Sequence, residues 1–324
     1  MKNLVRVLLR HLAAGALGAV PFLVFAQAGD YPNRPVSIIV PGPPGGGIDF
    51  FARLYVGELS KRWKVAPIVD YRPGASGMVG AEVATRAKPD GYTLLMTSDQ
   101  TMTQALFRKI QWDPERDLVP IAIVATTAMV CFTNPALGPK TWQELVAMAK
   151  ANPGKLNYVD YPQTTNALNL MRLFKTAGVR ITPVPFNGTI PGMQAVMTNS
   201  VQLFCSTPSG IVEQAKAGKL VVLATTGREA NPAFPGSRSL RGLGVDFEWT
   251  LWFGMMAPAG TPPAIVAKVQ ADVGEILALP DVQAGIRKFG LEPETRPPSE
   301  TSVAMSAGAR QFRELAREFN IVPE

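Results

Sequence analysis

Short apolar runs alternate with amphipathic, helix-length segments along the first third of the chain. The apolar runs predict strands at residues 36–40, 67–70 and 93–96. Apolar residues at helical spacing predict helices at residues 48–63 and 79–87. Strands separated by helix-length segments favour right-handed βαβ units and a mostly parallel sheet.

The alternation continues through the middle of the chain and ends in helices. A long β-branched apolar run covers residues 119–133. Beyond it, strands are predicted at 156–158, 181–184, 201–205, 220–224 and 249–257, and helices at 141–150, 166–177, 191–198 and 212–217. Two apolar stripes at helical spacing follow, within residues 265–276 and 305–319. No strand accompanies these last helices, so they must pack on a sheet formed earlier.

This order of elements predicts an α/β protein of two lobes. We expect the first lobe at residues 29–129 plus 250–324 and the second at 130–249, because the last helices need the first sheet. The chain would then cross between lobes near residues 128–133 and 249–257. Two crossing strands form a hinge, and a hinge between two lobes implies a cleft.

The first 28 residues differ from the rest. Lys2, Arg6 and Arg10 precede an acid-free apolar run over residues 12–25, and Ala-Gln-Ala follows at 26–28. The run is about 14 residues long, where a membrane-spanning helix, the alternative interpretation, needs roughly 20. The pattern therefore predicts a cleaved secretory signal peptide and an exported, periplasmic protein that is not inserted in the membrane afterwards.

Loss of that segment changes the charge and the chemistry of the chain. Loss of its three basic residues lowers the net charge from +7 to about +4. This mild positive charge favours small anions, and the chain has no nucleic-acid-binding pattern. The only histidine, His11, is lost as well. Histidine-dependent nucleophile pairs and histidine metal sites are thereby excluded, and we expect no cofactor, no metal and no catalytic residue.

The two cysteines lie in apolar, strand-like contexts. Cys131 and Cys205 are far apart in sequence, so spacing alone does not pair them. We expect two buried free thiols, with a disulfide as the alternative open to an exported protein.

The segment VPGPPGGGIDF at residues 40–50 joins a predicted strand to a predicted helix. It is not a nucleotide-binding P-loop, because Ile48 and Asp49 stand where that motif needs Lys and Ser or Thr. The dinucleotide fingerprint fails as well, since Phe50 replaces its last glycine. Glycines at a helix N-terminus expose backbone N–H groups, and the helix dipole favours an anion there. We interpret Asp49 as a helix-capping group in preference to a residue that contacts the ligand.

A second glycine loop, at residues 73–80, repeats the arrangement after the next strand. Each loop alone reads as a tight turn, but two neighbouring helix N-termini at one sheet edge favour a site for a carboxylate.

The whole mature chain resembles one family. The motifs that carry the resemblance are RPVSIIVPGPPGGGIDFFARL, YRPGASGMVGAEVATRAKPDGYTLL, NPGKLNY, VPFNGTIPGMQAV, QAKAGKL and WFGMMAPAGTPP. In this order they are similar to the Bug/TctC-type substrate-binding receptors of tripartite tricarboxylate transporters. The resemblance implies a periplasmic two-lobe protein of the type II, Venus flytrap fold. It would bind a small organic carboxylate as a monomer and deliver it to membrane permease subunits.

The resemblance also implies which residues contact the ligand. The resulting set, completed with neighbouring loop positions, is Gly46, Gly47, Ile48, Asp49, Ala75, Ser76, Gly77, Thr97, Ser98, Tyr161, Thr164, Asn187, Gly188, Thr189 and Ser206. Two positions depart from the family pattern. Gly42 replaces a usual aromatic, and YVDYPQTT at residues 158–165 replaces a glycine-containing loop. Tyr161 would supply an aromatic face and Asp160 an acceptor for a cationic group, unless Asp160 faces solvent and Tyr161 packs internally.

Three function classes are compatible with this sequence. A solute-binding receptor is the leading hypothesis. A sensor domain would use the same binding to engage a signalling membrane protein. An exported enzyme would have to work without histidine, and no carboxylate pair or Ser-Lys spacing suggests one.

Overall fold

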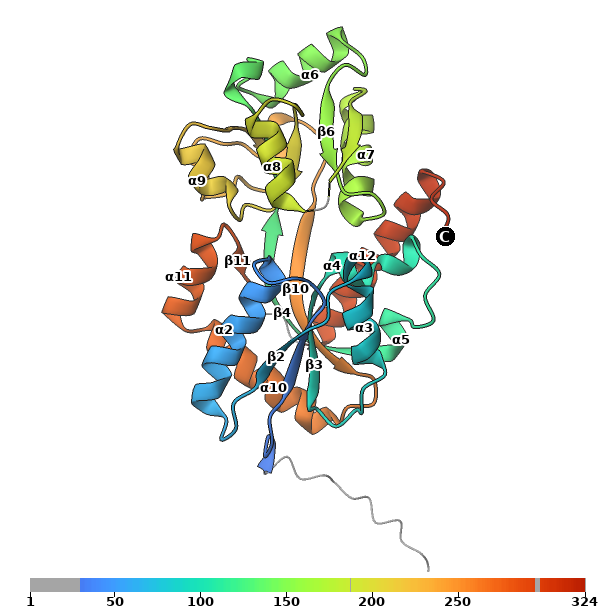
Figure 1. Cartoon of the computed structure of the whole chain (residues 1–324), viewed down its shortest axis with the longest axis vertical. Coiled ribbons are helices and arrows are strands. Elements are labelled where there is room, and N and C mark those ends of the chain that lie inside the picture. The colour runs from blue at the N-terminus through green and yellow to red at the C-terminus, as the bar shows by residue number, and fades with distance from the viewer. Residues whose placement is uncertain (1–29, 187, 295–297, 324) are drawn as a thin grey trace, which may run out of the picture.

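The computed structural model describes residues 30–186, 188–294 and 298–323. The predicted signal peptide therefore lies outside the described residues. Figure 1 shows an elongated molecule of two lobes, as the α/β two-lobe expectation requires. Within the described ranges, no helix has both the length and the apolar character needed to cross a membrane.

The lower lobe in Figure 1 is built on a six-stranded sheet in the order β11-β4-β10-β3-β1-β2. Its strands are β1 (Ser37–Val40), β2 (Ile68–Tyr71), β3 (Thr93–Ser98), β4 (Leu118–Ala128), β10 (Thr250–Pro258) and β11 (Glu292–Pro293). Its helices are α2 (Gly47–Arg62), α3 (Met78–Thr85), α4 (Asp99–Met102), α5 (Pro114–Asp117), α10 (Pro263–Leu277), α11 (Pro280–Lys288) and α12 (Pro298–Glu318).

Both faces of this sheet are buried. Ile38 and Val40 belong to the core shared with α2 and α10, whereas Ile39, on the opposite face, packs in a cluster with α3 and Met102. Successive side chains of a strand point to opposite faces, so a strand covered on both sides is apolar throughout. This explains why residues 36–40 read as one continuous apolar run.

The pairing of the strands corrects the expectation of a mostly parallel sheet. β1 is parallel to β2 and β3, as the βαβ pattern predicts. However, β10 runs antiparallel to β3 and β4, and β11 runs antiparallel to β4. The difference arises because β10 belongs to the returning chain, which re-enters the sheet from the other lobe, and β11 follows it through α10 and α11.

The upper lobe contains two small sheets. β8 (Phe204–Ser206), β5 (Val130–Thr133) and β9 (Val221–Thr225) form an antiparallel sheet, and β6 (Asn157–Asp160) pairs in parallel with β7 (Thr182–Pro185). A bridge between Tyr158 and Leu203 joins the two sheets. The surrounding helices are α6 (Trp142–Ala151), α7 (Thr165–Ala177), α8 (Thr189–Met197) and α9 (Ile211–Lys216).

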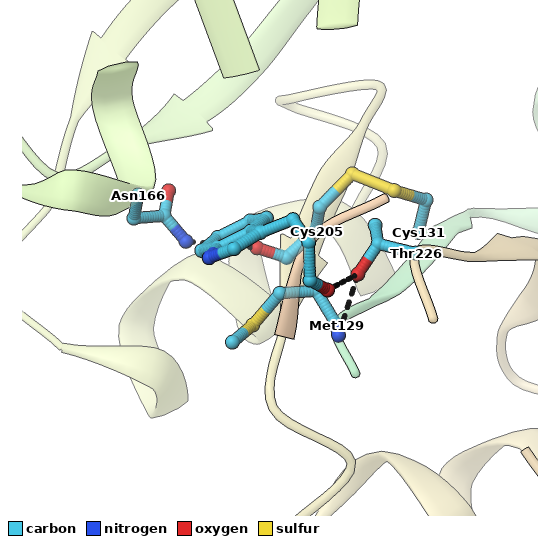
Figure 2. Close-up of a disulfide and its surroundings, with 6 residues drawn as sticks. Met129, Cys131, Asn166, Cys205 and Thr226 are labelled. Carbon is cyan, nitrogen blue, oxygen red and sulfur yellow. Dashed lines mark hydrogen bonds between the residues drawn. A yellow bond between two sulfur atoms is a disulfide. The ribbon is translucent and has the colours of Figure 1, made fainter. Parts of the chain in front are cut away.

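The two cysteines form a disulfide, so the expectation of free thiols is wrong. Cys131 on β5 and Cys205 on β8 are direct partners in the antiparallel register, and both are fully buried. Figure 2 shows the bond joining the two strands. The pairing depends on the strand register, which brings together residues 74 positions apart.

One threonine connects the two segments by which the chain crosses between lobes. Met129 separates β4 from β5, and Trp249 immediately precedes β10. The buried Thr226 hydroxyl accepts a hydrogen bond from the Met129 N–H (2.9 Å) and donates one to the Trp249 carbonyl (2.6 Å; Figure 2). The Thr226 backbone also bonds to both residues. The apolar run over residues 119–133 therefore forms two strands, with this junction between them.

Candidate functional site

The first glycine loop leads directly into α2. Gly46 is the N-cap of this helix, and a glycine there provides no side chain to accept hydrogen bonds from the first N–H groups. Gly46 is exposed, and Gly47 lies against β10. A Cβ atom on Gly47 would meet the Phe253 ring at 2.6 Å, so only glycine allows this approach.

Asp49 holds the first glycine loop in place. Its buried carboxylate accepts hydrogen bonds from the Gly45 N–H (2.8 Å), the Arg53 guanidinium (2.8 Å) and the Tyr71 hydroxyl. Burial alone would raise the pKa of Asp49, but these three bonds lower it below its usual value. Asp49 is therefore an ionised anchor of the loop.

The second glycine loop has an unusual backbone. Gly74, Ala75, Ser76 and Gly77 all have positive φ, at 135°, 47°, 55° and 94°. Left-handed conformations at residues other than glycine cost free energy and persist only where the surrounding structure enforces them, often at functional sites. Ala75 and Ser76 are exposed, and Gly77 is the N-cap of α3.

The structure brings the two glycine loops into contact. A Cβ atom on Gly80, in the first turn of α3, would lie 2.7 Å from the Pro41 Cα atom of the first loop. One on Gly77 would lie 2.8 Å from the Thr101 hydroxyl of α4 and 3.3 Å from the Pro41 carbonyl. The absence of side chains at these two glycines thus allows the loops to pack together.

Replacement of Gly80 by alanine tests this contact. We expect Gly80→Ala to lower the free energy of unfolding by about 1–3 kcal/mol, because the backbone of Pro41 must move to accept the methyl group. Gly57→Ala, in the exposed middle of α2 where no atom lies within 4 Å, should instead stabilise the protein by about 1 kcal/mol. Urea unfolding of both variants measures the contrast, and equal stability would show that the loops are not in close contact.

The third strand contributes buried polar residues to the same edge. Thr97 and Ser98 end β3 and are almost completely buried. Asp99, which follows them, was not predicted from the sequence. It is only 4% exposed, and its Oδ1 atom has no hydrogen-bond partner among the described residues. Burial raises the pKa of Asp99 to about 8.

Three predicted residues of the upper lobe form one cluster. The Tyr161 hydroxyl donates a hydrogen bond to the Thr189 Oγ1 atom (3.4 Å), and the Ser206 hydroxyl donates to the same atom (3.5 Å). The Tyr161 ring packs edge-on against Phe204, with 5.6 Å between the ring centres. Burial raises the pKa of Tyr161 to about 12, so its hydroxyl stays protonated.

Two helices begin beside this cluster, and their N-caps are of different kinds. Gly188 is the N-cap of α8, whereas Thr164 caps α7 by accepting a bond from the Ala167 N–H (3.3 Å). The Thr164 hydroxyl also donates to the Tyr161 carbonyl (2.6 Å), so it supports the loop that carries Tyr161. The predicted residue Asn187 lies outside the described residues.

Other buried polar atoms near this cluster were missed by the sequence reasoning. Thr165 Oγ1, Asn166 Oδ1 and Asp160 Oδ1 have no hydrogen-bond partner within the described ranges. Asp160 is only 8% exposed, so the alternative in which it faces solvent is wrong, and burial raises its pKa to about 6. A run of small polar residues at the start of a helix, such as residues 164–166, is the signal that would have found them.

Figure 1 shows where two of the helices that carry these residues begin. The start of α2 lies at the upper edge of the lower lobe, and the start of α8 lies at the lower edge of the upper lobe. The predicted residues thus form two groups, one on each lobe. Two cavities of about 390 and 470 Å³ lie elsewhere, beside α12, and the larger is lined by Asp99, Asn169 and Trp249 among others. In the part of the chain that the structure describes, no three His, Cys, Asp or Glu side chains gather as metal ligands.

Comparison with known proteins agrees with this arrangement. The chain matches the family described as "Tripartite tricarboxylate transporter family receptor" over residues 51–311. It is 35% identical over 285 residues to a Cupriavidus necator protein described as "UPF0065 protein in gbd 5'region", with 87% of this chain and 86% of that protein covered.

Two solved structures from Rhodopseudomonas palustris are similar over almost their whole length. The first, solved with adipate, is 27% identical with a TM-score of 0.82, and the alignment covers 91% of this chain and 100% of that one. The second, MatC with bound malate, is 27% identical with a TM-score of 0.78, and the alignment covers 88% and 100%. Since the family match spans most of the chain, this protein belongs to the tripartite tricarboxylate transporter receptor family, whose members are two-lobe α/β binding proteins and not enzymes.

Proposed function

We propose that this receptor binds a small organic carboxylate between its lobes in the periplasm and delivers it to the membrane subunits of a tripartite transporter. One observation carries the proposal. Gly46, Gly77 and Gly188 are the N-caps of α2, α3 and α8, so each of these helices begins without a side chain over its first N–H groups. Such N–H groups, together with the helix dipole, bind carboxylates. The adipate and malate complexes of its relatives support an organic acid as ligand.

The proposed site combines both groups of predicted residues. On the first lobe, proposed as residues 29–129 and 250–324, they are Gly46, Gly47, Ile48, Asp49, Ala75, Ser76, Gly77, Thr97 and Ser98. On the second lobe, proposed as residues 130–249, they are Tyr161, Thr164, Asn187, Gly188, Thr189 and Ser206. Asp49 acts through the loop, because its carboxylate is already bonded to Gly45, Arg53 and Tyr71. Gly42, which has open space around it, leaves room beside the first loop.

Removal of the Thr189 hydroxyl tests the site. This hydroxyl accepts hydrogen bonds from Tyr161 and Ser206 and stands at the start of α8, so it fixes the donors that would face a carboxylate. We expect Thr189→Ala to weaken binding of the best carboxylate about tenfold, the effect of roughly 1.4 kcal/mol. Thermal shift of the mature protein with mono-, di-, tri- and aromatic carboxylates identifies that ligand. At about a hundred times its Kd, it should add roughly 2.7 kcal/mol to the free energy of unfolding.

Thr198→Ala is the matched control, since Thr198 caps the other end of the same helix and its exposed hydroxyl bonds only to neighbouring residues. Its affinity should equal that of the unmodified protein. The proposal fails if no carboxylate stabilises the protein, or if both threonine variants bind equally well.

A further inference from the structure

A second, separate pocket lies on the outer side of the lower lobe. The cavity of about 390 Å³ is lined by α12, α5 and the connection from α4 to α5, and Figure 1 shows α5 at the right of this lobe. None of the residues that line it belongs to the proposed interlobe site. It is therefore a different site on the same protein.

The wall of this pocket is apolar and adaptable. Its apolar lining comes from several helices and strands and their connections and includes Met102, Leu106, Ile110, Trp112, Met256 and Met305. Methionine side chains are flexible and polarisable, so they fit ligands of differing shape. A cavity of this size lies within the range of pockets that hold small organic molecules.

The charges around the pocket are unbalanced. Glu115 is paired with Arg313 (3.1 Å), and Asp113 accepts bonds from the Glu115 and Arg116 N–H groups at the start of α5. Arg108 also lines the pocket, and its half-buried side chain forms no ion pair or hydrogen bond with another described residue. Lys109, beside it, is exposed. Both acids are thus engaged, whereas Arg108 retains an unused donor.

The Arg108 guanidinium is therefore an unpaired positive charge at an apolar pocket, and an anionic group can form charge-assisted hydrogen bonds with it. We propose that this pocket binds a medium-chain fatty carboxylate, with its hydrocarbon chain among the methionines and its carboxylate on Arg108. The receptor then has two sites of different chemistry: a polar one between the lobes and an amphipathic one beneath α12. The second site does not depend on the first.

Titration calorimetry of the mature protein with decanoate, kept below its micelle concentration, tests this proposal. We expect one decanoate site, with affinity reduced at least tenfold in Arg108→Gln because the charge-assisted bond is lost. Arg228→Gln, which changes an exposed arginine of the upper lobe, should leave the affinity unchanged. Thr189→Ala should also leave it unchanged, which separates this site from the interlobe one.

A second variant keeps the test decisive if Arg108→Gln folds poorly. Ser306 lines the pocket from α12, so Ser306→Trp should fill it and abolish decanoate binding while leaving the interlobe ligand bound. The proposal is overturned if decanoate does not bind, if Arg108→Gln or a folded Ser306→Trp binds it normally, or if Thr189→Ala abolishes its binding.

Discussion

The double variant Cys131→Ala/Cys205→Ala is expected to unfold with a free energy about 4 kcal/mol lower than that of the unmodified protein. The disulfide closes a loop of 74 residues, and the chain-entropy relation for a loop of that length gives about this value. The bond joins β5 to β8 in the fully buried core of the upper lobe, so the same region also loses packing around the two sulfur atoms. Urea unfolding under non-reducing conditions measures the difference.

The reductant supplies the control for that experiment. Addition of dithiothreitol to the unfolding titration should move the midpoint of the unmodified protein towards that of the double variant and leave the variant where it is. If reductant has no effect on either protein and their midpoints coincide, the two thiols do not pair in solution.

Asp99→Asn is expected to make the protein more stable than its parent at pH 9 and equally stable near pH 4. Burial raises the pKa of Asp99 to about 8 from an ordinary value of 3.8, so the folded state keeps a proton that the unfolded state releases. Stability therefore falls as the pH rises from about 4 to about 8, by at most about 1.4 kcal/mol for each pH unit. Asparagine resembles the protonated carboxyl group and removes this slope.

Urea unfolding at several pH values measures the Asp99 effect. Asp160 contributes a smaller slope of the same sign up to about pH 6, and this slope should persist in Asp99→Asn. Glu248, which lines the same cavity as Asp99, is unchanged in the variant. Asp281→Asn, at an exposed position on α11, serves as control and should keep the full pH dependence. Identical pH profiles for Asp99→Asn and the parent would contradict the protonated state of Asp99.

Local patterns in the sequence were sufficient to predict most elements and the first glycine loop. Residues 36–40 and 48–63 carry their own periodicity, and the structure places β1 and α2 there within one or two residues. A helix was also predicted from residue 141, and Thr141 is the N-cap of α6, where it accepts a bond from the Glu144 N–H. These features depend on neighbouring residues, which is why a single sequence reveals them.

Features that depend on distant residues were not predictable in the same way. The antiparallel entry of β10 and the disulfide require the register between segments far apart in the chain. In α3, the apolar residues Val79 and Val83 are exposed, because the small Gly80 and Ala84 face the core and the first loop. Hydrophobicity alone predicts that Val79 and Val83 face the core. The close approach of Pro41 to Gly80 instead turns the side of α3 with small residues towards the first loop.

The candidate site shows the same division. The glycines at the starts of α2, α3 and α8 could be identified because each forms a motif by itself. Asp99 could not, since what distinguishes it is a buried Oδ1 atom without a partner among the described residues, which only the folded chain reveals. The side chains that select one acid over another belong to this second kind.

The position of Thr226 limits how the two lobes can move relative to each other. Its hydroxyl and backbone hold Met129 and Trp249 at one level, so the two crossing segments cannot slide past each other without breaking buried hydrogen bonds. A sliding motion of one lobe along the other would therefore break these bonds, whereas a rotation that keeps the three residues together would not. Of the two ways in which the lobes could separate, the junction penalises sliding.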